Sequence, residues 1–85
     1  MPFEIYDIEL GRDGDGLRMG GTLENLTLAE GKSVRLRLSI LGDGGSVQAA
    51  QEVEVRAPAA GESVAFSVVM PMPQVIRGWK YEVVE

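Results

Sequence analysis

Residues 34–41 read VRLRLSIL, and the alternation of apolar and polar residues in this segment decides the fold class. If the segment is extended, its apolar side chains point to one face, and Arg35, Arg37 and Ser39 point to the other. A period of two is typical of a strand with one buried face and one solvated face. The turn residues GDGG follow at 42–45, and a second alternating run comes after them. The pattern predicts a small antiparallel β domain, and it explains a fold without explaining an activity.

The length and composition limit how such a domain can be stabilised. The 85 residues form one domain, residues 1–85, and they include no Cys and no His. A disulfide or a Cys/His zinc site therefore cannot support the core, which in a chain this short contributes only about 3–5 kcal/mol. We expect the remaining stability to come from association, either with a second copy of the chain or with a larger protein partner.

The charge distribution excludes several classes of partner. The net charge is −5, and the eight Lys and Arg residues are dispersed singly, which argues against binding to nucleic acid or to an anionic membrane surface. No stretch approaches the ~20 apolar residues of a membrane span. The first ten residues, MPFEIYDIEL, are acidic where a signal peptide is basic. We expect a cytoplasmic protein without direct membrane insertion, and docking on a membrane complex from the cytosolic side stays open.

Turn residues divide the chain into seven short extended segments, at residues 3–10, 17–25, 34–41, two within 47–56, 64–70 and 79–84. This spacing predicts an all-β protein, a small antiparallel immunoglobulin-like β sandwich of about seven strands. The apolar parity of the first segment switches after Ile5, which predicts a bulge or an edge strand that changes sheets. A short helical turn within residues 23–30 is the one helical alternative.

The two segments around the GDGG turn predict their own pairing register. An antiparallel pairing in which the residue numbers sum to 89 matches apolar with apolar residues and cations with anions. Three pairs then lie opposite each other: Leu36 with Val53, Arg35 with Glu54, and Arg37 with Glu52. A shift of one residue loses both matches, so the two arginines have a structural explanation as cross-strand partners.

The order of motifs from Gly20 onward resembles a known family. The motifs are GGTLEN (20–25), the alternating strand, the Gly/Asp turn, QEVEVR (51–56), PAAGE (58–62), VAFSV (64–68) and YEV (81–83). This order is similar to that of the FxLYD-type domain, an immunoglobulin-like β sandwich often found at the ends of bacterial and archaeal chains. Asn25 and the Gly61–Glu62 link before Phe66 carry most of the specificity. The resemblance implies a binding or spacer module with no catalytic residues.

Acidic and glycine-rich motifs do not indicate a metal or phosphate site. Asp13 and Asp15 in the DGDG string suggest calcium, but in an EF-hand loop the first and twelfth positions would then be Gly11 and Thr22, which carry no carboxylate. A flexible turn is the better interpretation, because Asp and Gly tolerate a left-handed backbone. The chain also lacks a His base and a Cys nucleophile. We therefore expect no enzyme activity, no cofactor and no metal.

The loop 70–76 (MPMPQVI) is the best candidate for contact with a partner, because it is more apolar than a solvated loop needs to be. Met adapts its shape to a partner, and Pro lowers the entropy lost on binding. The candidate contact residues are Met70, Pro71, Met72, Pro73, Val75 and Ile76. The alternative is that the loop folds over the open end of the sandwich. Trp79 is expected in the core or at its edge, because it shares parity with Tyr81 and Val83.

The sequence therefore predicts a non-catalytic protein–protein interaction module. Its expected role is a small accessory or stabilising subunit docked on a larger complex, through the apolar loop and an unpaired edge strand. A ligand- or carbohydrate-binding module is one alternative, which would require aromatic side chains on an exposed strand face. A spacer domain of a longer chain is the other alternative.

Overall fold

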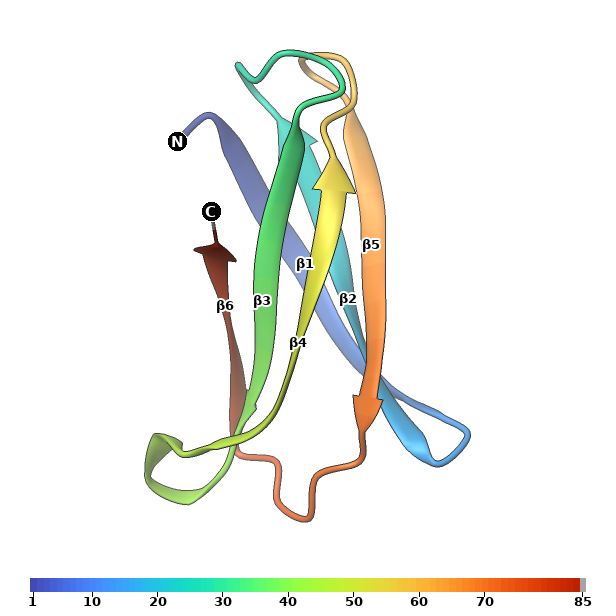
Figure 1. The fold of residues 1–85 in the computed structure, drawn as a ribbon, viewed down its shortest axis with the longest axis vertical. Coiled ribbons are helices and arrows are strands. Elements are labelled where there is room, and N and C mark those ends of the chain that lie inside the picture. Colours follow the sequence, from blue (N-terminus) through green and yellow to red (C-terminus); the bar gives the residue numbers. More distant parts are fainter. Residues whose placement is uncertain (85) are drawn as a thin grey trace.

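The computed structural model describes residues 1–84, which form two antiparallel sheets of three strands each (Figure 1). The strands are β1 (Phe3–Asp13), β2 (Gly16–Asn25), β3 (Ser33–Leu41), β4 (Val47–Arg56), β5 (Ser63–Pro71) and β6 (Gly78–Val84), and a short 3-10 turn, η1, spans Asp43–Gly45. The predicted all-β sandwich is thus confirmed. Residues 1–84 contain six strands because Val47–Arg56 forms one continuous strand where two were expected. Residues 26–32, which follow β2, contain bends and a turn and no helix.

The strand order gives the sandwich an immunoglobulin-like topology. One sheet has the order β1-β2-β5 and the other has the order β4-β3-β6. The chain therefore crosses between the sheets, since β5 pairs with β2 and β6 pairs with β3. The order β1-β2-β5 corresponds to strands A-B-E of immunoglobulin domains, and the β3–β6 pair corresponds to strands C and F. β3 is the central strand of its sheet, and β6 is an edge strand.

The predicted register between β3 and β4 is confirmed along most of its length, with apolar residues opposite apolar residues. Arg37 forms an ion pair with Glu52, with 2.9 Å between Nη2 and Oε2. Arg35 and Glu54 lie opposite each other at a longer distance of 3.6 Å. Both pairs are on the solvated face, where they fix the register more than they stabilise the fold.

β1 contains the bulge that its apolar pattern predicts. The register with β2 shifts directly after Tyr6, and Asp7 has a φ of 55°, which is uncommon for a residue with a Cβ atom. Ile5 before the bulge and Ile8 after it both pack against the core. The extra residue thus returns the apolar side chains to the inner face, and β1 stays within one sheet.

The core lies between the two sheets and is built from the inner faces of five strands. The buried apolar residues in the described chain are Phe3, Leu17, Met19, Leu23, Val34, Leu36, Leu38, Ile40, Val55, Ala57, Phe66 and Met70. β3 contributes four of them, which explains why its alternation is the clearest in the sequence. None of them lies on β6.

Asn25 is fully buried and joins two loops at one end of the sandwich. Its Nδ2 donates hydrogen bonds to the carbonyl oxygens of Leu28 (3.0 Å) and Pro58 (2.8 Å), and its Oδ1 accepts one from the Leu28 N–H (2.8 Å). Its backbone N–H donates to the Glu62 carbonyl, and its own carbonyl accepts from the Gly61 N–H. The two positions most specific for the family resemblance are therefore in direct contact, and they have a structural role.

Candidate interaction surface

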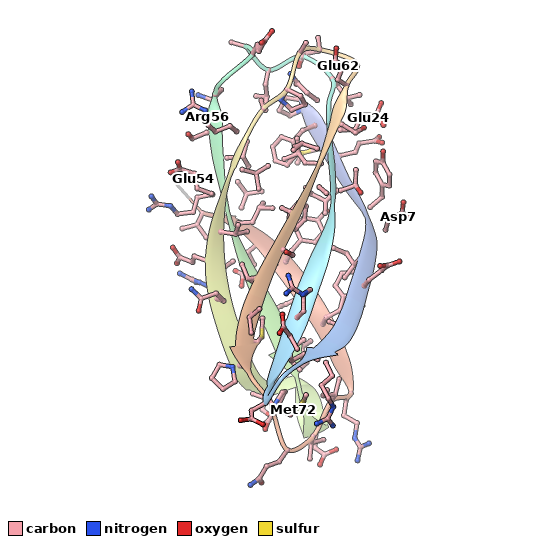
Figure 2. The ribbon with its side chains drawn as sticks, turned by 90° about the vertical axis from the view of Figure 1, so that its right-hand side faces the viewer. Asp7, Glu24, Glu54, Arg56, Glu62 and Met72 are labelled. Carbon is pink, nitrogen blue, oxygen red and sulfur yellow. The ribbon has the colours of Figure 1, made fainter. Side chains whose placement is uncertain are left out.

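The loop that the sequence indicates as a contact surface begins inside the core. Met70 is only 2% exposed, and the alternation of β5 continues through it and turns it inward. Met72 is half-buried and also packs against the core, at the lower end of the sandwich in Figure 2. The prediction that Met70 contacts a partner is therefore wrong, because its side chain is not accessible.

The rest of this loop covers the end of the sandwich. The four other predicted contact residues range from exposed to half-buried: Pro71, Ile76, Pro73 and Val75. The end of the loop is fixed by Arg77, whose N–H donates to the Leu41 carbonyl at 2.7 Å and whose Nε donates to Asp43 Oδ1 at 2.8 Å. The structure thus agrees with the alternative that the loop folds over the open end, and it leaves Ile76 as the one large apolar side chain of the loop that is well exposed.

A different apolar surface lies on β6. Trp79, Tyr81 and Val83 are 43%, 38% and 47% exposed, which gives β6 more exposed large apolar residues than any other described strand. They lie directly opposite fully buried residues of β3: Ile40, Leu38 and Leu36, respectively. Because opposite residues of an antiparallel pair share a face, the three side chains point inward and are nevertheless uncovered. Trp79 is thus at the edge of the core, as its parity predicts.

The inner face of β6 is uncovered because the sandwich is closed on one flank only. β4 and β5 lie against each other across the two sheets, whereas β1 crosses from the upper left to the lower right of Figure 1 and diverges from β6. A cleft of about 350 Å³ separates Tyr81 from Phe3 and Ile5 of β1. Val83 lines a second cleft of about 410 Å³ with Phe3. We name the surface formed by Trp79, Tyr81, Val83, Phe3 and Ile5 the open flank.

The outer face of β6 is charged. Lys80 Nζ and Glu82 Oε1 are 3.5 Å apart, and both side chains are 47% exposed. Ser39 and Arg37 of β3 lie beside them in the sheet. The edge strand thus has an apolar inner row and a charged outer row, the alternation typical of an antiparallel sheet with one solvated face.

The acidic turn connects β1 and β2. Asp13 ends β1 and pairs with Arg18, while Asp15 lies in the turn to β2, where Gly14 has a φ of 57°. Residues 1–84 contain no group of three His, Cys, Asp or Glu side chains placed to hold an ion. The Asp13 side chain therefore serves the β1–β2 hairpin.

A scan against models of protein families, a search of curated proteins and a search of solved structures found no significant match. The resemblance to FxLYD-type domains therefore stays a prediction. Within residues 1–84, no helix is long and apolar enough to cross a membrane.

Sequence reasoning did not anticipate that the inner row of β6 is exposed. Alternation assigns Trp79, Tyr81 and Val83 to the inner face, but it does not tell whether another strand covers that face. The composition of the segment could have indicated an exposed contact surface on this strand, because two of the five aromatic residues of the chain fall within the last seven residues.

Proposed function

We propose that this domain is a non-catalytic protein–protein interaction module and that the open flank is its contact surface. The observation that carries the proposal is the exposure of Trp79, Tyr81 and Val83, although all three point inward. Contiguous exposed apolar side chains of this kind mark contact surfaces in soluble proteins. Trp and Tyr are also the residue types that contribute most to binding energy at interfaces.

The energy available at the open flank is considerable for a domain of this size. Full burial of a large apolar side chain contributes about 1.5–3 kcal/mol, so covering the exposed half of the three side chains contributes roughly 2–4 kcal/mol. This is comparable with the stability that the core of a small domain supplies by itself. In the proposed role, the chain is a cytoplasmic accessory or stabilising subunit whose own stability increases on association.

Photo-crosslinking in the cells that naturally make the protein tests the proposal. The photoreactive residue p-benzoylphenylalanine replaces Tyr81 in one variant and Ala50 in a control variant. Ala50 lies on β4, at the opposite edge of the same sheet, and is exposed. We expect an ultraviolet-dependent protein adduct from position 81 and none from position 50. No adduct at position 81, or equal adducts at both positions, overturns the proposal.

A further inference from the structure

We infer that the partner at the open flank is a second copy of this chain, joined by antiparallel pairing of β6 with β6 of the second copy. This inference rests on the proposed function, because it names the occupant of the same surface. It commits to a two-fold dimer in which the two β4-β3-β6 sheets become one continuous sheet of six strands.

The backbone of β6 is available for such pairing. β6 pairs with β3 on one side, and Figure 1 shows no strand beyond its other side. In an antiparallel ladder, alternate residues direct their N–H and C=O groups away from the paired neighbour. The seven residues of β6 therefore present a row of backbone groups that a strand of equal length can pair with.

The outer face of β6 is complementary to itself in charge. If the two-fold axis passes through the pair formed by Tyr81 and its symmetry mate, Lys80 lies opposite Glu82 of the second copy. By symmetry, Glu82 lies opposite Lys80 of the second copy. Opposite charges that face each other across an antiparallel pair stabilise it, so each dimer gains two such pairs. Both side chains are about half exposed, and in the single chain they pair with each other at 3.5 Å, so two cross-strand pairs replace one such pair in each copy.

The inner face is matched in the same register. Trp79 lies opposite Val83 of the second copy, and the two Tyr81 side chains lie beside each other. Aromatic–aromatic and aromatic–β-branched contacts are favourable cross-strand pairs. The two-fold axis is perpendicular to the sheet, so the β1-β2-β5 sheets of both copies lie on the same side of it. The two open flanks therefore face each other and cover one another.

Other registers lose these matches. A shift of two residues in one direction sets Lys80 opposite Lys80 of the second copy, and a shift in the other direction sets Glu82 opposite Glu82. A shift of one residue places the charged row of one copy on the apolar face of the other. The sequence WKYEV is thus self-complementary in a single antiparallel register, which is why we choose a second copy over an unrelated partner.

Charge reversal at β6 tests the inference through the mass of the species in solution. Sedimentation velocity and native mass spectrometry are performed on the parent chain at concentrations up to ~1 mM, the weak end of the affinity scale. The variants are Lys80→Glu, Glu82→Lys and the double exchange of both in one chain. Each single variant places like charges opposite each other twice per dimer, so we expect roughly tenfold weaker self-association or more.

The decisive measurement is the mixture of the two single variants. The first variant carries carboxylates at both positions and the second carries ammonium groups at both, so their mixed pair is complementary. We expect a heterodimer from the mixture and a restored homodimer from the double exchange. Melting temperatures are measured for every variant, because Arg37 lies beside position 82 and Glu82→Lys adds a second cation there.

Three results overturn the inference. They are a parent chain that stays monomeric up to ~1 mM, single variants that associate as well as the parent, and a mixture without heterodimer. The crosslinking at Tyr81 separates this failure from failure of the proposed function. An adduct with a different protein would support the interaction module and refute the second copy as its partner. The absence of any adduct would refute both proposals.

Discussion

Replacing Asn25 tests whether the buried amide holds the two loops at the end of the sandwich. Asn25→Leu keeps the branched shape of the side chain but removes three side-chain hydrogen bonds, those of 2.8–3.0 Å to Leu28 and Pro58. Each hydrogen bond makes a net contribution of about 1 kcal/mol, and the backbone groups that lose their partner stay buried. We therefore expect the free energy of unfolding to decrease by about 3 kcal/mol or more. For a domain of this size, that loss corresponds to a decrease of roughly 12–24 °C in melting temperature.

Urea and thermal denaturation, followed by circular dichroism, measure this loss. Thr27→Ala is the matched control, because Thr27 lies in the same loop, is exposed and makes no side-chain hydrogen bond within residues 1–84. We expect the control to change the free energy of unfolding by less than about 0.5 kcal/mol. An Asn25→Leu variant within about 1 kcal/mol of the parent would refute the assigned role of the amide.

Asn25→Asp separates the two donor bonds from the acceptor bond. The introduced carboxylate still accepts from the Leu28 N–H, but it faces the carbonyl oxygens of Leu28 and Pro58 without a donor. Protonation restores one donor, so folding favours the protonated form. Destabilisation relative to the parent is therefore expected to be largest at pH 7, to decrease as the pH falls toward about 4, the ordinary pKa of an Asp side chain, and to be smallest below that value. Equal destabilisation at both pH values contradicts the hydrogen-bond geometry.

Two further predictions concern packing and register. Gly20→Ala is expected to cost about 1–3 kcal/mol, because a Cβ atom there would lie 2.7 Å from the Phe66 carbonyl oxygen, a backbone atom of the neighbouring strand. Gly11→Ala has open space around it and is expected to be nearly neutral. Denaturation midpoints of the two variants check this contrast, and equal midpoints would argue against it. A double-mutant cycle on Arg37 and Glu52 is expected to give a coupling energy of about 0.2–1 kcal/mol that decreases with added salt. A coupling that does not respond to salt would show that the two side chains interact by packing instead of charge.

The sequence predicts most of the fold because alternation and charge pairing are local properties of strands. The β3–β4 register follows from VRLRLSIL and QEVEVR, and the bulge in β1 follows from the parity switch after Ile5. The sequence does not predict which strands lie at the edges, because that depends on the crossing between sheets. The exposure of the whole inner row of β6 was therefore not foreseen. Met70 was assigned to the contact loop although it also continues the alternation of residues 64–70, and this alternation turns it inward.

The strand order also determines when the open flank can form. β1–β2 and β3–β4 are hairpins between strands that follow each other in the chain, whereas β2–β5 and β3–β6 join strands that are far apart. Pairings between distant segments close large loops, so they are the slow steps of folding, in the range of milliseconds to seconds. β6 is the last of the six described strands to emerge in synthesis, and until it docks, one edge of β3 with Leu36, Leu38 and Ile40 stays unpaired. The open flank is thus the last part of the sandwich to be assembled, and a chain waiting for its own β6 is most exposed to association with another chain.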